Sequence, residues 1–375
     1  MKPETLVAQA LHAIDETTGA IVPPIQLATT YARDAEYALR GPGYTRDQNP
    51  TPKHAERVLA ALEGGAEAMA FSSGMAAATA VFRAVCSPGD HVIAPRVGYY
   101  NLRGWLERWS TRWGVTVDLV DTTDAALVKA AIRTTTKVVW VETPANPTWD
   151  VTDLAATAEL VHGVGALFCV DSTCATPVHT QPIAHGADLV MHSATKFLGG
   201  HTDVLAGMLV TAKVNEAWQR IAELRHDEGA VLAPLEAYLL LRGMRTLFVR
   251  VERSSRTAQA IAERIAFLPN VTVLYPGLSS HPQHAIAAKQ MARGFGSMLS
   301  IRVGGTAQTA IGVIQRLAVW VPATSLGGVE SLVEHRYTVE GPNTPTPPDL
   351  LRLSVGLEHE DDLFEDLRQA LEYRA

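Results

Sequence analysis

One lysine of this chain lies in a setting that suits carbonyl chemistry. Lys196 follows the apolar run 187–191 and lies within the stretch SATKFLGGH, residues 193–201. An amine that has lost its proton can attack an aldehyde, and the hydroxyls of Ser193 and Thr195 are suitable donors to a phosphate. The stretch therefore predicts a site for an aldehyde that carries a phosphate. The alternative interpretation is a lysine on an exposed loop.

A second motif has the small residues that a phosphate-binding turn needs. Ser73, Gly74 and Met75 follow the apolar run 68–71 and begin an alanine-rich stretch of helical character. The first N–H groups of a helix have no partner within the helix and attract phosphate. A simple tight turn is the alternative. The motif lacks the G-x-G-x-x-G pattern, which argues against a nicotinamide-binding site.

Two further polar residues follow apolar runs. Asp171 ends the run 167–170, and Asn146 comes shortly after the run 137–141. Residues at the carboxyl ends of parallel strands point into the ligand crevice of such a sheet. A carboxylate there can keep the pyridine nitrogen of pyridoxal 5′-phosphate (PLP) protonated, and Asn146 can donate a hydrogen bond to the ring hydroxyl oxygen. Asp171 as the N-cap of a turn is the alternative. Together with Lys196, these residues predict PLP as the cofactor.

The elements that must position these residues are apolar runs separated by helical stretches. The runs predicted as strands are 68–71, 91–94, 115–119, 137–141, 166–170, 189–191 and 207–210. Such alternation predicts an α/β fold with a mostly parallel sheet. A long helical region over 234–267 leads to a tail of different texture, with apolar runs at 271–274, 296–303, 309–318 and 351–355 and an acidic helix at 361–373.

This pattern divides the chain into three parts. Residues 1–46 are expected to form an extended N-terminal arm, residues 47–241 a large PLP-binding domain and residues 242–375 a smaller C-terminal α+β domain. A chain of 375 residues is long enough for two hydrophobic cores.

Composition excludes several classes of function. The net charge of −7 argues against nucleic-acid binding, and no apolar run approaches the length of a membrane span. The N-terminus lacks the features of a signal peptide, and the three cysteines have no metal-ligand spacing, so we expect reduced thiols and a cytoplasmic location. A metal site is a rival interpretation, but no short metal-binding signature joins the histidines that would form it, His179, His185, His192 and His201.

With these motifs in order, the chain resembles the Cys/Met metabolism family of PLP enzymes, in particular its cystathionine γ-synthases and γ-lyases. The resemblance covers nearly the whole chain, through the stretches 18–25, 44–51, 72–77, 142–147, 171–177, 193–201, 242–247, 325–332 and 352–358. It implies the PLP-dependent transferase fold of type I (aspartate aminotransferase-like), with a mostly parallel central sheet. It also implies a homotetramer, a dimer of active dimers with shared sites.

The resemblance implies a role for each matching residue around the cofactor. Lys196 resembles the lysine that joins the cofactor aldehyde, and Asp171 the partner of the ring nitrogen. Tyr99 fits the aromatic residue that stacks on the ring, with proton transfer to or from the leaving group as a second role. The remaining cofactor contacts implied by the family are Thr173 and Asn146 at the ring, Ser73, Gly74, Met75, Ser193 and Thr195 at the phosphate, and Tyr44 and Arg46 at the phosphate of a neighbouring subunit.

On the substrate side, Arg352 resembles the arginine that binds the α-carboxylate, and Ser325 a residue close to the lysine and the substrate. The implied reaction is PLP-dependent γ-elimination or γ-replacement on a small sulfur amino acid, with cystathionine or an O-acyl homoserine as substrate. β-Elimination, as in cystathionine β-lyase, is the alternative reaction. An inactive structural or regulatory family member is an alternative of another class, against which the joint presence of Lys196, Asp171 and Arg352 argues.

Some residues depart from the usual family pattern. Tyr100 and Asn101 follow Tyr99, where two small residues are usual, and methionine γ-lyases tend to have a cysteine in place of Asn101. Thr324 stands where several γ-lyases have glutamate and β-lyases often have an aromatic residue, and Arg336 where proline is frequent. If Asn101 and Thr324 line the substrate pocket, they fit a long polar side chain better than a short thioether.

Overall fold

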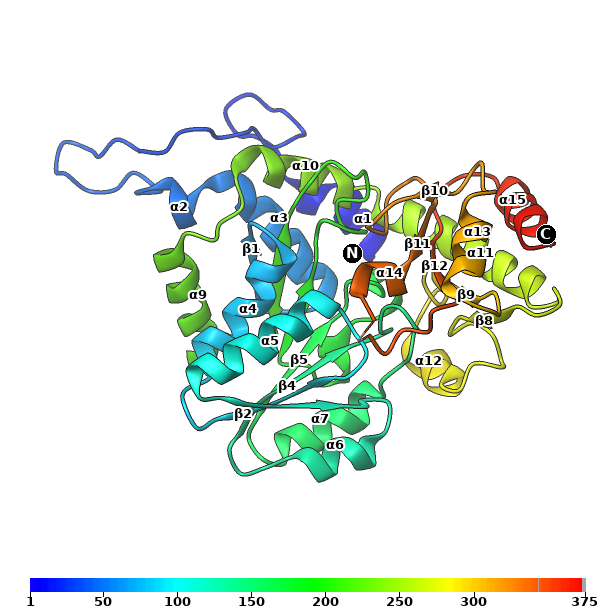
Figure 1. Cartoon of the computed structure of the whole chain (residues 1–375). Helices are drawn as coiled ribbons and strands as arrows, with labels where there is room; N and C mark the ends of the chain where they lie inside the picture. Colours follow the sequence, from blue (N-terminus) through cyan, green and yellow to red (C-terminus); the bar gives the residue numbers. More distant parts are fainter. Residues whose placement is uncertain (343, 373–375) are drawn as a thin grey trace.

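The computed structural model describes residues 1–342 and 344–372, and Figure 1 shows how the elements are arranged. A seven-stranded sheet has the order β1-β7-β6-β5-β4-β2-β3. Its strands are β1 (Glu67–Phe71), β2 (His91–Pro95), β3 (Thr116–Val120), β4 (Thr136–Glu142), β5 (Leu167–Asp171), β6 (Leu189–His192) and β7 (Gly207–Thr211). Only β7 runs antiparallel to its neighbours within this sheet, which confirms the prediction of an α/β fold with a mostly parallel sheet.

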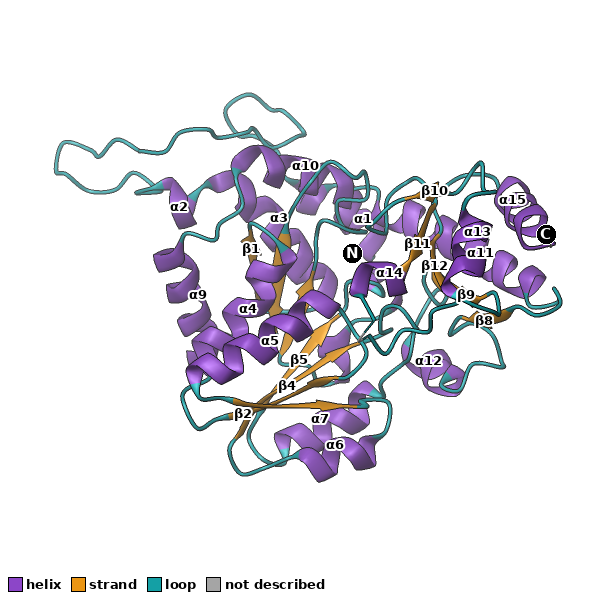
Figure 2. Ribbon diagram, viewed as in Figure 1, coloured by secondary structure: helices purple, strands orange, loops and turns teal. Residues whose placement is uncertain are grey.

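Helices cover both faces of this sheet, as Figure 2 shows. Alternate residues of each strand point to opposite faces, so Val170 and Val190 pack in one hydrophobic cluster while Cys169 and Met191 pack in the other. The first cluster is covered by α1 (Pro3–Ala8), α3 (Pro50–Glu63), α6 (Ala125–Ala131), α7 (Leu154–His162), α8 (Thr176–His179) and α10 (Pro234–Met244), and the second by α4 (Gly74–Val85), α5 (Tyr100–Trp113) and α9 (Glu216–Glu228).

A second sheet of five strands has the order β10-β11-β12-β9-β8. Its strands are β8 (Thr272–Leu274), β9 (Met298–Arg302), β10 (Val321–Pro322), β11 (Leu332–His335) and β12 (Leu350–Ser354). A third hydrophobic cluster joins this sheet to α11 (Leu247–Ile265), α13 (Ala307–Ile314) and α15 (Glu360–Glu372). The apolar runs 271–274, 296–303 and 351–355 overlap β8, β9 and β12, no such run marks β10 or β11, and the run 309–318 lies largely in α13. The last residue of the predicted acidic helix, Tyr373, lies outside the described residues.

The long helical region predicted over 234–267 is two helices, α10 and α11, with a break at Arg245 and Thr246. Gly243 approaches the loop after Lys196 so closely that a Cβ atom would lie 2.1 Å from the carbonyl oxygen of Gly199. The guanidinium of Arg250 donates to the carbonyl oxygens of Phe197 and Gly243, at 2.9 and 2.7 Å. The break therefore ties the start of α11 to the loop that carries Lys196. The domain boundary predicted at residue 242 falls inside α10 and stays a prediction.

The N-terminal arm is extended only in part. Its first residues form α1 and the 3₁₀ turn η1 (Ala10–His12), in which Val7 and Ala10 are buried against the first cluster. The extended part over residues 13–44 leads to α2 (Thr45–Gln48) and projects from the body of the molecule, as the dark-blue loops of Figure 1 show.

Candidate active site

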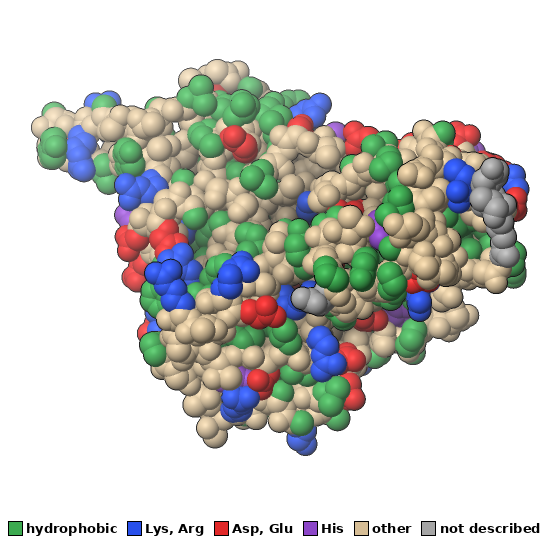
Figure 3. Space-filling view, in the orientation of Figure 1, with side chains coloured by type: hydrophobic (Ala, Val, Ile, Leu, Met, Phe, Trp, Pro, Cys, Tyr) green, Lys and Arg blue, Asp and Glu red, His purple; other side chains and the backbone are tan. Residues whose placement is uncertain are grey.

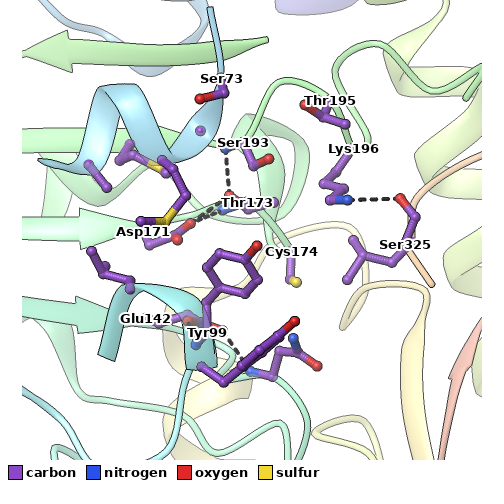
Figure 4. Close-up of a pocket in the computed structure, with 18 of the residues that line it drawn as sticks. Ser73, Tyr99, Glu142, Asp171, Thr173, Cys174, Ser193, Thr195, Lys196 and Ser325 are labelled. Carbon is purple, nitrogen blue, oxygen red and sulfur yellow. Dashed lines mark hydrogen bonds between the residues drawn. The ribbon is translucent and has the colours of Figure 1, made fainter. Parts of the chain in front are cut away.

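A cavity lies where β4, β5 and β6 end, between the two sheets. All predicted site residues except Tyr44 and Arg46 line it: Ser73, Gly74, Met75, Tyr99, Asn146, Asp171, Thr173, Ser193, Thr195, Lys196, Ser325 and Arg352. Figure 4 shows ten of the lining residues labelled, with the Tyr99 ring seen between Asp171 and Lys196. Residues that are far apart in the sequence therefore meet in one place.

Lys196 has the surroundings of a lysine that reacts as a neutral amine. Its Nζ atom donates a hydrogen bond to the Ser325 Oγ atom at 2.8 Å, and Figure 4 shows this bond. Burial lowers the pKa of Lys196, and the positive charge of Arg352 lowers it further. Both effects favour the amine that has lost its proton, the form that attacks a carbonyl.

Asp171 ends β5, and its Oδ1 atom accepts hydrogen bonds from Thr173, at 3.0 Å from the backbone nitrogen and 2.6 Å from the hydroxyl. The same hydroxyl oxygen accepts a bond from the Ser193 backbone nitrogen at 2.8 Å. Burial raises the pKa of Asp171, and the two hydrogen bonds from Thr173 oppose this rise. The Oδ2 atom keeps its capacity to accept, so the site fits a cationic ring nitrogen, whose charge would hold the carboxyl ionised.

The start of α4 faces the loop between β6 and Lys196. The Ser73 Oγ atom caps the helix by accepting a bond from the Ala76 backbone nitrogen at 3.1 Å. Gly74 approaches Ser193 so closely that a Cβ atom would lie 2.8 Å from the Ser193 Oγ atom. A helix N-terminus beside a serine hydroxyl is a suitable cradle for phosphate, so the residues present fit the phosphate of PLP.

Thr195 also lines the cavity, but its hydroxyl is engaged elsewhere. The Oγ1 atom donates to the Ala206 carbonyl oxygen at 3.1 Å and accepts from the Ala206 backbone nitrogen at 3.0 Å. A hydroxyl has one proton to donate, so donation to a phosphate, as the family resemblance implies, requires this hydroxyl to turn. That role stays a prediction.

Glu142, for which the sequence motifs predicted no role, ends β4 beside Asp171 in the register of the sheet. Its two carboxylate oxygens accept bonds from two backbone nitrogens, that of Tyr99 at 2.7 Å and that of Asn146 at 2.8 Å. Burial raises the pKa of Glu142, and the nearby Asp171 raises it further. Its place after an apolar run, the same signal that identified Asp171, was sufficient to single it out.

Arg352 lies on β12 and is buried, with 3% of its surface exposed. Its Nη2 atom donates to the Ser325 carbonyl oxygen at 2.6 Å and lies 2.7 Å from the Glu334 carboxylate, and Nη1 lies 3.5 Å from the Asn146 side-chain oxygen. Burial lowers the pKa of Arg352 to about 10. Among the described residues no partner reaches Nε, so this guanidinium has capacity for a ligand carboxylate.

Ser325 connects the lysine to this arginine. It accepts a bond from Lys196 on its side chain and from Arg352 on its carbonyl oxygen. Its φ angle of +112° lies in a region that residues other than glycine rarely adopt. Such backbone conformations persist where the surroundings fix them, and here the hydrogen bonds from Lys196 and Arg352 hold Ser325.

Other lining residues were noticed in the sequence only as departures from the family, or not at all. Tyr100, Thr324 and Arg336 line the cavity, whereas Asn101 does not. The Asn101 side-chain nitrogen instead donates to the Tyr99 hydroxyl at 3.0 Å. Cys174 also lines the cavity, and burial raises the pKa of its thiol, which keeps the thiol protonated.

Tyr44 and Arg46 lie outside the cavity of their own chain. Arg46 donates to the His226 carbonyl oxygen at 3.3 Å, and its guanidinium carbon lies 5.6 Å from the centre of the Tyr44 ring. A contact with the phosphate of a neighbouring subunit stays a prediction for both residues.

Three of the four histidines considered for a metal site serve other contacts. His192 forms a buried pair with Glu63 at 2.6 Å, and the ring Nδ1 atoms of His179 and His201 lie 2.9 Å from carbonyl oxygens. Within residues 1–342 and 344–372, no group of three or more histidine, cysteine, aspartate or glutamate side chains is placed to hold a metal ion.

Comparison with known proteins identifies the family. The model of the Cys/Met metabolism PLP-dependent enzyme family matches residues 4–372. The chain belongs to the Cys/Met metabolism family of PLP-dependent enzymes. Its cofactor is therefore PLP, and the protein is an enzyme of transsulfuration, as the order of the sequence motifs predicted.

Relatives in this family carry different activities. The chain is 45% identical to a cystathionine gamma-synthase of Mycobacterium tuberculosis, over 98% of this chain and 96% of the relative. It is 39% identical to a cystathionine beta-lyase of Coxiella burnetii, over 98% of this chain and 97% of the relative.

Solved structures of the family are closely similar. The metB structure of Corynebacterium glutamicum superposes with a TM-score of 0.96 at 42% identity, covering 99% of this chain and 98% of that one. A cystathionine gamma-lyase of Lactobacillus plantarum, complexed with L-serine, superposes with a TM-score of 0.93 at 38% identity and the same coverage. Among the described residues, no helix has the length and apolar character that crossing a membrane requires.

Proposed function

We propose that this enzyme catalyses γ-elimination or γ-replacement on cystathionine or an O-acyl homoserine. The observation that carries the proposal is the 45% identity, over nearly the full length, to a protein named cystathionine gamma-synthase. The cavity supports it, because polar groups such as Thr324 and Arg336 line it beyond Lys196. These groups suit a long and polar side chain.

In this proposal, Arg352 binds the α-carboxylate of the substrate and thereby orients the Cα–H bond towards Lys196. The lowered pKa of Lys196 keeps its amine ready to accept the α-proton, and a γ-leaving group requires the same amine to move a proton at Cβ as well. PLP, when bound, supplies an electron sink for the negative charge that develops on Cα. The Asp171 carboxylate balances positive charge on the ring nitrogen, and Tyr99 stacks against the ring.

β-Elimination on cystathionine is the second candidate. It is favoured by the 39% identity to a protein named cystathionine beta-lyase, over nearly the same length of chain. Both reactions begin with removal of the α-proton, so the residues around Lys196 suit either.

Product analysis distinguishes the two candidates. With cystathionine, γ-elimination yields 2-oxobutanoate and cysteine, whereas β-elimination yields pyruvate and homocysteine. O-acetyl- and O-succinylhomoserine, each with and without an added thiol, then separate elimination from replacement. Pyruvate alone from cystathionine, with no product from either homoserine ester, would overturn the γ assignment.

We further propose a homotetramer in which active sites are shared between subunits. The extended arm supports this assembly, because Ile21, Leu27 and Tyr37 are 73–77% exposed on it. Figure 3 shows the arm standing clear of the body, with apolar side chains on its surface. Such surfaces are typical of protein contacts.

We also propose a cytoplasmic location, since the three cysteines are unpaired.

Subunit mixing tests the shared site. Arg46→Ala and Lys196→Ala variants are each expected to be impaired, and hybrids formed from both regain activity. In a hybrid dimer, one of the two sites combines an intact Lys196 with an intact Arg46 from the other subunit. Full activity of a monomer at assay concentration would contradict the shared site.

A further inference from the structure

A second arginine faces the same cavity as Arg352. Arg336 is the first residue of α14 (Arg336–Glu340), lines the cavity, and has a side chain that is only 2% exposed. Removing a guanidinium from water is costly unless its hydrogen bonds and charge are compensated. The contacts of Arg336 therefore show which of its N–H groups have partners in the protein and which do not.

Three of the five N–H groups of Arg336 have partners in the protein. Nη1 donates to Glu334 at 2.9 Å, and Nε and Nη2 donate to one oxygen of Glu340 at 3.1 and 2.6 Å. The guanidinium carbon lies 5.0 Å from the centre of the Tyr100 ring, a cation–π contact. A guanidinium carries five donors, so among the described residues two N–H groups of Arg336 have no protein partner and can serve a ligand in the cavity.

The charges around Arg336 permit an anion to bind. The arginine cluster consists of Arg103, Arg336 and Arg352 with Glu334 and Glu340, joined by contacts of 2.6–4.0 Å. It contains one more positive than negative side chain. Glu142 is a further carboxyl near Arg336, but burial and the nearby Asp171 raise its pKa to about 8, which reduces its negative charge at neutral pH. A carboxylate that enters the cluster is therefore attracted by its net charge.

Glu334 also fixes the two cavity arginines relative to each other. Its Oε2 atom lies 2.9 Å from the Nη1 atom of Arg336 and 2.7 Å from the Nη2 atom of Arg352. Both guanidinium groups are thus held by one carboxylate on β11. Glu334 therefore fixes the spacing between the guanidinium groups of Arg336 and Arg352, each of which can bind a carboxylate, and both side chains line the cavity.

We propose that Arg336 binds a carboxylate at the far end of the substrate side chain while Arg352 binds the α-carboxylate. The enzyme therefore selects amino acids with a second, distal carboxylate, such as those with a succinyl or a cystathionine side chain. The proposal rests on the proposed function for the identity of the amino acid. It does not depend on whether the β- or the γ-bond is broken.

A purely structural role for Arg336 is the competing interpretation. Glu340, which Arg336 binds, also accepts hydrogen bonds from Thr344 and Thr346, the latter at 3.2 Å, and so anchors these two residues beyond the end of α14. Loss of such an anchor would weaken the binding of every amino acid alike. The two interpretations therefore differ in selectivity rather than in overall affinity.

Binding of unreactive amino acids to the holoenzyme distinguishes a selective role of Arg336 from a purely structural one. The probes are α-amino dicarboxylic acids of increasing length, from glutamate to 2-aminosuberate, each matched with an amino acid of the same length that ends in a methyl group. Dissociation constants come from the change in visible absorption and from calorimetry. In the wild type, we expect one dicarboxylate length to bind on the order of 10- to 100-fold more tightly than its methyl-ended match.

Arg336→Lys keeps the charge but loses the planar fork, and we expect it to remove most of that preference while changing the binding of methyl-ended probes less than about 2-fold. Arg302→Lys is the matched control, because Arg302 also pairs with a buried carboxylate, that of Asp349 at 3.0 Å, but belongs neither to the cavity lining nor to the arginine cluster. It should keep the wild-type preference. Equal losses for both probe series in Arg336→Lys would overturn the proposal.

Two further measurements keep the proposal open to refutation. If Arg336→Lys does not fold, the wild-type series still decides, since no preference for a dicarboxylate at any length overturns the proposal. The ratio of kcat/KM for O-succinylhomoserine to that for O-acetylhomoserine should also fall in Arg336→Lys. If neither ester reacts, the γ assignment fails while the binding series still tests Arg336.

Discussion

The two walls of the active-site cavity are built in different ways. The strand-end wall, Glu142, Asp171, Thr173, Ser193 and Lys196, comes from the carboxyl ends of β4, β5 and β6 and the loops that follow them. Short hydrogen bonds to backbone amides and hydroxyls hold it, such as those between Asp171 and Thr173. The arginine wall, Thr324, Ser325, Arg336 and Arg352, is held mostly by buried ion pairs with Glu334 and Glu340.

The two walls therefore suit two different tasks, binding of the cofactor and selection of the substrate. The strand-end wall presents groups that match PLP, which every member of the family binds, and rigid strand ends fix such groups well. The arginine wall presents long side chains, whose identity changes the shape and charge of the cavity without disturbing the sheet. We infer that substitutions in the first wall affect all substrates. In the second wall, Arg352 binds the α-carboxylate that all substrates share, whereas substitutions at Thr324 and Arg336 affect substrates selectively.

The largest effect is expected at Lys196. Lys196→Ala removes the amine that joins the cofactor and accepts the α-proton, so turnover should fall at least about 10³-fold for every substrate. The visible absorption of the lysine-bound cofactor should be lost as well, which a spectrum of the purified protein measures. Lys289→Ala, at a side chain that is 69% exposed, is the control and should behave as the wild type. Normal turnover without Lys196 would refute its role.

A smaller but still general effect is expected at Asp171. Asp171→Asn retains an oxygen that can accept the bonds from Thr173 but loses the charge that faces the ring nitrogen. Removal of one such electrostatic partner typically costs about 10²- to 10³-fold in rate. Steady-state kinetics with two substrates should show the same loss for both, and Asp203→Asn, an exposed position, should show none. A loss confined to one substrate would break the distinction between the walls.

The strand-end wall was also the part that the sequence predicted best. Asp171 and Asn146 follow buried apolar runs, and Gly74 begins a helix directly after one, so position along the chain is enough to place them at one edge of the sheet. Glu142 obeys the same rule, but its role is to hold the backbone of Tyr99 and Asn146, which no local pattern reveals.

The arginine wall was predicted less well because its contacts are not local. Arg352 meets Asn146 across 206 residues of sequence, and Arg336 was noticed only because it replaces a residue that is common in the family. The short strands β10 and β11, after which Thr324, Ser325 and Arg336 follow in the sequence, have no long apolar run. The break between α10 and α11 likewise depends on contacts of Gly243 and Arg250 with the Lys196 loop.

The coupling between the walls can be measured through pH. The charge of Arg352 contributes to the lowered pKa of Lys196, so Arg352→Gln should raise that pKa. Cofactor capture requires the neutral amine. When PLP is added to PLP-free protein, the visible absorption should therefore recover slowly below a certain pH, and this pH should be higher in the variant. Arg302→Gln, at a partly exposed ion pair outside the cavity, is the control. A profile unchanged by Arg352→Gln would show that the two walls act independently.

The smallest and most selective effect is expected at Thr324, an exposed residue at the rim of the arginine wall. Thr324→Tyr narrows the space available to a long side chain but leaves the residues around Lys196 unchanged. Overfilling a packed site costs on the order of 1–3 kcal/mol, and at an exposed rim we expect the lower end, a loss of about 5- to 10-fold in kcat/KM for cystathionine. Cysteine, whose side chain ends before the rim, should lose less than about 2-fold. Thr324→Ser, which keeps the hydroxyl and the space, should leave the ratio between the two substrates unchanged. Since both substrates share every contact with the strand-end wall, an equal loss for both would mean that Thr324 acts through that wall, and the division of tasks would fail.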